Sequence, residues 1–364
     1  MVYSTSIFKR VIKEFRLAIA RREVMVSPLN SNCLDVEMLV TGGAGFIGSH
    51  LVDSLMKKGG KVRLLDNLSA GSTDNVADWT GHPNFTLIEG DCLNRKDIRK
   101  AMKGCGLVFH LAANPEVRVG AVDTEIDFEQ NIVATRNILE EMRESETAKR
   151  IVFTSTSAVY GDVRILPTPE EYGSLEPISL YGASKLACEA LISAYCHTFD
   201  MRGVIYRFAN IVGSRGRHGV IWDFIHKLLE NPLELEILGD GTQTKSYLTV
   251  DACVDALLFG LRHASRMVEI YNIGSEDQIS VKEIARIVTE EMGLKDVRFR
   301  YTGGVRGGRG WIGDVKTMFL DVSKMKRLGW KPRYNSAESV KMASGQILRE
   351  LEFKKESSHA NQGF

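Results

Sequence analysis

The sequence predicts an α/β protein built on a doubly wound parallel sheet. The stretch from Leu39 to Leu51, LVTGGAGFIGSHL, joins a short apolar run to a glycine-rich turn and then to an apolar pattern of helical period. A second apolar run, VRLLDNL, follows, so the order is strand, turn, helix, strand, which is that of a βαβ unit. Later apolar runs also end in small or polar residues, as the strands of such a sheet do.

Composition bounds the class of protein. The chain has 364 residues, 44% of them hydrophobic, and a net charge of +1, which predicts a soluble protein of one large domain or two intimate ones. This balance gives no indication of a nucleic-acid partner, and no apolar run approaches the ~20 residues that would span a bilayer. The six cysteines form no CxxC pair and follow no secretory segment, which predicts reduced thiols in the cytoplasm. No histidine has a recognisable ligand spacing, so no metal is expected.

Both ends of the chain differ from its body. In residues 1–37, apolar side chains such as Ile7, Val11 and Phe15 recur at helical spacing between basic ones, which predicts a basic amphipathic extension. It is interpreted as a membrane-surface or targeting helix, as a helix packed on the body, or as sequence upstream of a natural start at Met38. Residues 351–364 are polar at their end and are expected to form a disordered tail.

The glycines of the first turn satisfy two spacings, Gly43-x-Gly45-x-x-Gly48 and Gly42-x-x-Gly45-x-x-Gly48. Either spacing lets the turn tighten, brings backbone amides to a pyrophosphate at the helix N-terminus and lets helix and strand pack closely. Asp66 ends the second strand about 20 residues further on, where a carboxylate can bind the ribose hydroxyls. No arginine stands nearby to bind a 2′-phosphate. These features favour NAD over NADP, the alternative being a purely structural turn.

Three later strands end in residues that suit the same site. Asp91 and Cys92 follow one strand where an adenine would lie, and Ala112 and Ala113 follow the next, where small side chains leave room for a cofactor. A third strand runs into the hydroxyl cluster at 154–157, which by itself is equally typical of strand-end capping.

Tyr181 and Lys185 lie four residues apart in a segment whose apolar period from Ala183 to Ala194 is helical. The phenol and the ammonium therefore project from the same helix face. Beside a cofactor, the charge of Lys185 would stabilise a phenolate and bring the pKa of Tyr181 down towards the working pH.

Ordered segments along the chain resemble the extended short-chain dehydrogenase/reductase superfamily, and within it the NAD-dependent nucleotide-sugar epimerases and dehydratases. These segments are TGGAGFIGSHL, DNLSAG, GDCLN, FHLAANPEVR, NIVATRN, STSAVYGD, YGASKLACE, RFANIVGSRG and LGDGTQTKSYLTVDA. The resemblance extends from about residue 38 to about residue 332. It implies a Rossmann-type domain over 38–207 that binds NAD, a mainly substrate-binding domain over 208–350 that returns in part to the sheet, and a homodimer.

The resemblance also implies roles for individual residues. The catalytic positions fall on Thr156, Tyr181 and Lys185. The cofactor positions, which also include Tyr181 and Lys185, fall on Gly42, Gly45, Phe46, Ile47, Gly48, Asp66, Asn67, Asp91, Cys92, Leu111, Ala112, Ala113 and Asn131. The substrate positions fall on Thr156, Asn210, Lys245, Arg306, Arg309 and Met318.

Some substrate positions depart from relatives. Lys245 stands where many UDP-galactose 4-epimerases carry an arginine, so one charge stays but the bidentate fork is lost. Arg306 and Arg309 lie in a glycine-rich loop that is expected either to close over phosphates or to remain a solvated loop. Met318 stands where relatives limit the sugar's C2 substituent, and a flexible methionine leaves both hexose and N-acetylhexosamine open.

The choice within the family depends on carboxylates. In 4,6-dehydratases an Asp-Glu pair follows the catalytic threonine, and the decarboxylases that make UDP-xylose keep the glutamate, whereas this chain has Ser157 and Ala158. The resemblance is therefore closest to UDP-glucose (UDP-galactose) 4-epimerases, which oxidise the sugar transiently at C4 and return hydride to the opposite face. Alternatives are an epimerase acting on an N-acetylhexosamine or at another carbon, a dehydratase or a reductase. A non-enzymatic dinucleotide-sensing regulator is disfavoured by the intact Tyr181 and Lys185.

Overall fold

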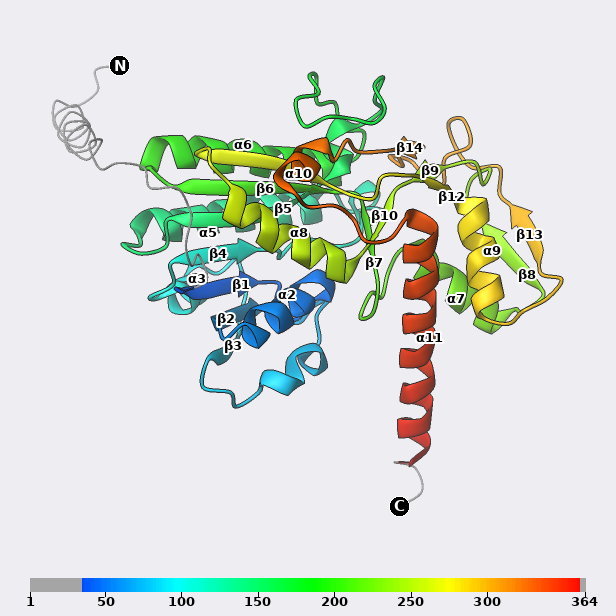
Figure 1. The fold of residues 1–364 in the computed structure, drawn as a ribbon, viewed down its shortest axis with the longest axis horizontal. Coiled ribbons are helices and arrows are strands. Elements are labelled where there is room, and N and C mark those ends of the chain that lie inside the picture. The colour runs from blue at the N-terminus through cyan, green and yellow to red at the C-terminus, as the bar shows by residue number, and fades with distance from the viewer. Residues whose placement is uncertain (1–34, 361–364) are drawn as a thin grey trace.

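The computed structural model describes residues 35–360, with the side chains of 353–360 excepted. The predicted extension over 1–37 therefore lies almost wholly outside the described residues, and so do residues 361–364 of the predicted tail. Figure 1 shows the arrangement of the elements, with a large sheet and its helices on one side and smaller sheets and helices on the other.

Within residues 35–360, seven parallel strands form the main sheet in the order β3-β2-β1-β4-β5-β6-β11. Their bounds are β1 (Glu37–Thr41), β2 (Lys61–Asp66), β3 (Phe85–Glu89), β4 (Leu107–His110), β5 (Arg150–Thr156), β6 (Arg202–Phe208) and β11 (Val268–Ile273). The strand order reverses between β1 and β4, which is the topological switch point of a doubly wound sheet. The predicted doubly wound parallel sheet is confirmed.

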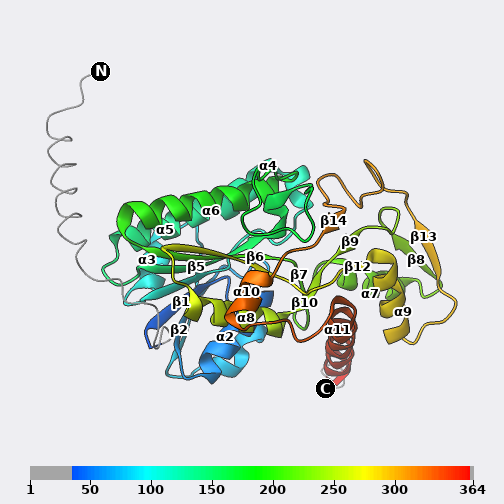
Figure 2. The same ribbon diagram turned by 45° about the horizontal axis from the view of Figure 1, so that its top comes forward.

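Helices cover both faces of this sheet, as Figure 2 shows. One face carries α2 (Phe46–Lys57), α8 (Val250–His263) and α10 (Ser323–Leu328), and the other carries α3 (Arg95–Met102), α5 (Ala134–Glu144) and α6 (Leu180–Phe199). Successive side chains of β1 alternate between the two: Val40 packs with the α2 and α8 side, whereas Leu39 packs with the α3, α5 and α6 side. Both are fully buried, which is why the strand reads as a continuous apolar run.

Short helical segments connect these elements around the carboxyl ends of the strands. They are the 3₁₀ segments η1 (Thr73–Trp79), η2 (Val119–Ala121) and η4 (Ser157–Tyr160), the helix α4 (Thr124–Asp127) and the π-helical segment η3 (Phe128–Val133), which continues directly into α5.

A second group of elements lies beside the carboxyl ends of β5 and β6 (Figure 1). It comprises β7 (Asn210–Val212), α7 (Val220–Glu230), β8 (Glu234–Ile237), β9 (Thr244–Lys245), β10 (Tyr247–Thr249), β12 (Ile279–Ser280), α9 (Val281–Glu291), β13 (Arg298–Tyr301), β14 (Thr317–Met318) and α11 (Ser336–Ala360). Strands β8 and β13 pair in parallel, β9 lies between β12 and β14, and β7 pairs with β10. Its own core contains Ile225, Leu235, Ile284 and Val340, all fully buried.

Helix α11 departs from the predicted tail. The sequence predicts disorder from residue 351, but the structure continues the helix to Ala360. The segment from 351 begins LEFKKE, and its leucine, glutamate and lysine residues are good helix formers that let an existing helix propagate. Figure 1 shows the end of this helix extending away from the rest of the molecule. None of the helices within residues 35–360 is long and apolar enough to cross a membrane.

Candidate active site

A cavity of about 560 Å³ lies where the main sheet meets the second group of elements. Residues at or just past the carboxyl ends of β1, β2, β3, β4, β5 and β6 line it, together with residues of α7 and of the loop before β14. Because ligands of doubly wound sheets bind outside the carboxyl ends of the strands, this is the expected position for a cofactor and substrate.

The glycine turn between β1 and α2 forms one wall of the cavity. Gly42 has φ +67°, and a Cβ there would lie 2.7 Å from the backbone nitrogen of Ala112. A Cβ on Gly48 would lie 2.1 Å from the carbonyl oxygen of Gly42, so the first turn of α2 packs directly on the loop. The turn therefore requires glycine for backbone approach. It leaves the helix N-terminus facing the cavity, as pyrophosphate binding demands.

Asp66 closes the nucleotide end of the cavity. Its carboxylate, 8% exposed, accepts hydrogen bonds from the backbone amides of Ala44 and Leu68, both at 2.9 Å. A carboxylate has about four acceptor sites, so Asp66 retains capacity for the two hydroxyls of a ribose. Next to it, Asn67 donates to Asp91 at 3.1 Å. Burial raises the pKa of Cys92 to about 12, so it lines the cavity as a neutral thiol.

Most residues predicted to bind the cofactor line this one cavity, and their arrangement fits a dinucleotide. They are Gly42, Gly45, Phe46, Ile47, Gly48, Asp66, Asn67, Asp91, Cys92, Leu111, Ala112, Ala113, Tyr181 and Lys185.

Asn131 is placed differently, because it does not line the cavity. Its side chain is 2% exposed; its Oδ1 accepts from the Asn114 amide at 3.1 Å, and its Nδ2 donates to Ser184 Oγ at 2.8 Å. Asn131 thus joins the loop after β4 to helix α6, and it positions residues of the site from behind.

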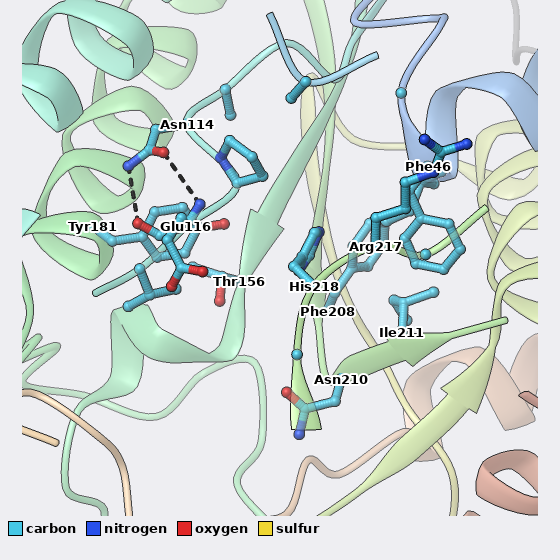
Figure 3. Close-up of a pocket in the computed structure, with 18 of the residues that line it drawn as sticks. Phe46, Asn114, Glu116, Thr156, Tyr181, Phe208, Asn210, Ile211, Arg217 and His218 are labelled. Atoms are coloured by element: carbon cyan, nitrogen blue, oxygen red, sulfur yellow. Dashed lines mark hydrogen bonds between the residues drawn. The ribbon is translucent and has the colours of Figure 1, made fainter. Parts of the chain in front are cut away.

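The three predicted catalytic residues meet at the sugar end of the cavity. Thr156 ends β5, and α6, which begins at Leu180 with Ser179 as its N-cap, presents Tyr181 and Lys185. Figure 3 shows Tyr181 and Thr156 on the same side of the cavity. The ammonium of Lys185 donates to the Thr154 carbonyl at 3.0 Å and lies 5.9 Å from the centre of the Tyr181 ring.

Burial dominates the titration of the Tyr181–Lys185 pair. It lowers the pKa of Lys185 from 10.5 to about 8, because a charged amine loses hydration in the core. It raises the pKa of Tyr181 above its ordinary value, and the nearby Asp127 adds to the rise. The sequence predicts a lowered phenol pKa beside a bound cofactor, whereas in the protein alone burial raises this pKa. The spacing of the pair indicates a shared helix face but says nothing about desolvation.

The predicted substrate residues divide into two groups. Asn210, Lys245 and Met318 line the cavity with Thr156. The Nδ2 of Asn210 is buried without a hydrogen-bond partner among the described residues, which leaves a donor available for a ligand. Lys245 pairs with Asp314 at 2.6 Å and lies 5.3 Å from the centre of the Trp311 ring.

Arg306 and Arg309, predicted either to close over phosphates or to remain in a solvated loop, do not line the cavity. The guanidinium of Arg309 binds both oxygens of Asp162, at 2.9 and 2.8 Å, and the carbonyl of Asp314 at 2.7 Å. A carboxylate on another loop therefore engages this guanidinium. Arg306 lies on the same loop with φ +41°.

Other charged residues line the cavity that sequence reasoning missed. Among them are Glu116, Arg118, Arg215 and Arg217, and His218, whose pKa burial lowers, lies beside them. Figure 3 shows Arg217 and His218 across the cavity from Tyr181. Two signals in the sequence could have found them: their position after strands, in NPEVR after β4 and SRGRHG after β7, and the place of Glu116, Arg118 and Arg215 in segments that resemble the family.

Comparison with known proteins agrees with this geometry. Residues 38–274 match the model of the NAD dependent epimerase/dehydratase family. The chain is 35% identical over 310 residues to a putative UDP-glucose 4-epimerase of Methanocaldococcus jannaschii, covering 84% of this chain and 96% of the relative. It is 32% identical over 344 residues to UDP-glucuronic acid decarboxylase 6 of Arabidopsis thaliana, covering 91% and 93%. A crystal structure of UDP-galactose 4-epimerase superimposes with a TM-score of 0.76 at 41% identity, covering 86% of this chain and 99% of that one.

The family match spans most of the described chain, and its dinucleotide motif lies in the cavity that holds the threonine, tyrosine and lysine. The cofactor is NAD, as the family description states. The chain belongs to the NAD-dependent epimerase/dehydratase family of the extended short-chain dehydrogenases/reductases.

Proposed function

We propose that the protein is an NAD-dependent UDP-glucose/UDP-galactose 4-epimerase. The observation that carries the proposal is that Thr156, Tyr181 and Lys185 line the same cavity as the dinucleotide turn, while Ser157 and Ala158 follow the threonine without a carboxylate. These residues are the ones needed to oxidise the sugar at one carbon and to return hydride to the same carbon. The relatives named UDP-glucose and UDP-galactose 4-epimerase support the choice of substrate.

The chain's own residues handle the proton. Gly42, Gly45 and Asp66 would hold NAD, whose nicotinamide would supply the hydride acceptor and donor for the sugar C4. Tyr181 would take the proton of the sugar 4-hydroxyl, and the Lys185 ammonium would stabilise the phenolate against the burial that raises its pKa. Thr156 Oγ1 would hydrogen-bond the same sugar oxygen as charge develops on it.

Proton NMR tests the reaction directly. UDP-galactose incubated with the purified protein and no added NAD should yield the anomeric signal of UDP-glucose, because NAD is regenerated in every turnover and can stay bound. Net release of NADH would instead indicate a reductase, and a change of product mass would indicate a dehydratase or decarboxylase. UDP-N-acetylglucosamine in the same assay tests whether Met318 admits a larger C2 substituent.

Tyr181→Phe tests the assigned base. Removal of the phenolic oxygen should lower kcat by about 10²–10⁴-fold, with NAD still released on denaturation at the wild-type amount. Tyr195→Phe is the matched control, since Tyr195 lies on the same helix but bonds Glu140 outside the cavity. Full activity of Tyr181→Phe would remove Tyr181 from this role.

We also propose that the enzyme acts in the cytoplasm as a homodimer. The five cysteines among residues 35–360 are buried free thiols, which suits a reducing compartment. Helices α5 and α6 lie together on one outer face of the molecule (Figure 2), the kind of face that pairs in relatives. Light scattering on the purified protein tests the dimer.

A further inference from the structure

The loop that follows β4 places a charged pair in the wall of the cavity. The guanidinium of Arg118 binds the carboxylate of Glu116 through two bonds, Nε to Oε1 at 2.9 Å and Nη2 to Oε2 at 3.0 Å. The Arg118 amide also donates to Glu116 Oε1 at 3.2 Å. Both residues line the cavity, so this bidentate pair is available to a ligand.

The Glu116 backbone is held by a buried asparagine. Asn114 accepts from the Glu116 amide and donates to its carbonyl, both at 3.1 Å, as the dashed lines of Figure 3 show. Asn114 is 6% exposed. The Oδ1 of Asn131 accepts from the Asn114 backbone amide, and the Nδ2 of Asn131 donates to the Ser184 hydroxyl on α6. Helix α6 also carries Tyr181, so Glu116 and the proposed base stand on one connected framework.

Arg118 also contacts residues of the second group of elements. Its Nη1 lies 3.5 Å from Asp223 on α7, and its guanidinium carbon lies 5.9 Å from the centre of the Trp311 ring. One guanidinium therefore faces two carboxylates. The formal charge of Glu116, Arg118 and Asp223 together is negative, and Arg118 brings the loop after β4 into contact with α7 of the second group of elements.

Glu116 is a poor candidate for a general base. The hydrogen bonds from Arg118 hold the pKa of the Glu116 carboxyl below its ordinary value. Both carboxylate oxygens are already bonded to the guanidinium. A general base needs a pKa near the working pH and a free oxygen. An ionised carboxylate of this kind can instead accept hydrogen bonds from uncharged hydroxyls.

We propose that the Glu116–Arg118 pair selects a neutral hexose over a hexuronate, a specificity that rests on the proposed function. Thr156 and Tyr181 would fix the sugar at C4, and C6 lies only two bonds beyond that carbon. Figure 3 shows Glu116 on the same side of the cavity as Thr156 and Tyr181. A C6 carboxylate beside Thr156 and Tyr181 would meet the negative charge of Glu116, while the guanidinium of Arg118 on the same loop is already paired with that glutamate. A C6 or C3 hydroxyl would find an acceptor.

Binding titrations with the NAD-containing protein test this selectivity independently of turnover. The ligands are UDP-glucose, UDP-glucuronate and UDP, titrated into the wild type, Glu116→Gln and Arg118→Gln. We expect wild type to bind UDP-glucuronate at least about tenfold more weakly than UDP-glucose. Glu116→Gln frees the guanidinium and should bring the two affinities within about threefold, and Arg118→Gln should widen the difference.

The opposite shifts distinguish specificity from a structural defect, which would weaken both sugar nucleotides alike in both variants. Glu125→Gln, an exposed glutamate on α4 outside the cavity, is the matched control. If the wild type bound UDP-glucose and UDP-glucuronate equally well, that result would overturn the inference and leave the proposed function untouched. A parallel loss of UDP affinity in Arg118→Gln would assign this arginine to the diphosphate and would also overturn it.

The inference and the proposed function can fail separately. Preferential binding of UDP-glucose without conversion of UDP-galactose would remove the proposed 4-epimerase activity and leave the selectivity standing. Conversion of UDP-galactose with equal affinity for the hexuronate would do the reverse. Binding of neither sugar nucleotide would overturn both.

Discussion

At the scale of single residues, burial governs the chemistry of the site more than spacing does. Lys185 is 2% exposed, and its ammonium is held by the Thr154 carbonyl at 3.0 Å and by the face of the Phe153 ring at 4.8 Å. These contacts compensate only part of the lost hydration, so the pKa of this lysine falls to about 8. A buried amine with such a pKa is typical of a functional position.

The lowered pKa of Lys185 predicts a pH-dependent contribution to stability. Between pH 8 and 10.5 the unfolded chain binds more protons at this site than the folded chain does. Stability rises with pH wherever the unfolded state binds more protons, so the cost of burying Lys185 is greatest below about pH 8 and vanishes towards pH 10.5.

Lys185→Met should therefore gain most in free energy of unfolding, relative to wild type, at about pH 7, and this relative gain should shrink as the pH rises. Denaturant unfolding of both proteins across this range measures the difference, and Lys100→Met, at an exposed lysine, serves as the control. A difference that stays constant with pH would contradict the lowered pKa.

At the scale of elements, the junction of β1 and α2 depends on backbone contact. Helix α2 begins at Phe46 with Gly45 as its N-cap, and no side chain caps it, so the amides of its first turn face the cavity. Gly48, within that first turn, lies against the Gly42 carbonyl. Helix and turn can hold a pyrophosphate only while this contact persists.

Gly48→Ala should disrupt the junction. The new Cβ would lie 2.1 Å from a backbone oxygen, which cannot rotate away as a flexible side chain can. We expect a loss of about 1–3 kcal/mol in free energy of unfolding together with reduced NAD content after purification. Gly173→Ala is the control, because a Cβ there meets nothing within 4 Å. Wild-type NAD content in Gly48→Ala would show that close packing is not required.

At the scale of the whole molecule, the long C-terminal helix reaches back to the cavity. Gln346 Oε1 accepts from the Ser214 amide at 3.1 Å, and Glu350 Oε1 accepts from the Arg215 amide at 2.9 Å. Arg215 adopts φ +63° and pairs with Asp53 on α2 at 2.9 Å. The loop that lines the cavity is thus held between α2 and α11, one from each group of elements.

Glu350→Ala should loosen this loop without touching the reacting atoms. Loss of a charged acceptor for a backbone amide should raise KM for the nucleotide sugar by roughly tenfold and leave kcat near the wild-type value. Glu352→Ala, an exposed glutamate on the same helix, is the control. A fall in kcat at unchanged KM would mean that the loop acts on chemistry and not on binding.

Local pattern in the sequence predicts a large part of this protein. The strand, glycine turn and helix from Leu39 to Leu51 predict the dinucleotide site, because only glycine permits such a close backbone approach. In a parallel sheet all strands point the same way, so residues that end them gather at one edge. That is how Asp66, Ala112 and Thr156 come to line one cavity.

The choice of charge partners is decided only in the tertiary structure. Arg309 bonds Asp162, 147 positions away in the chain, and Arg118 faces Asp223, 105 positions away. Sequence alone left Arg309 either at the phosphates or in a solvated loop, and it gave Arg118 no role. Long charged side chains bind whichever partner the fold brings within reach, and burial, which sets the pKa values of Tyr181 and Lys185, is likewise a property of the packed whole.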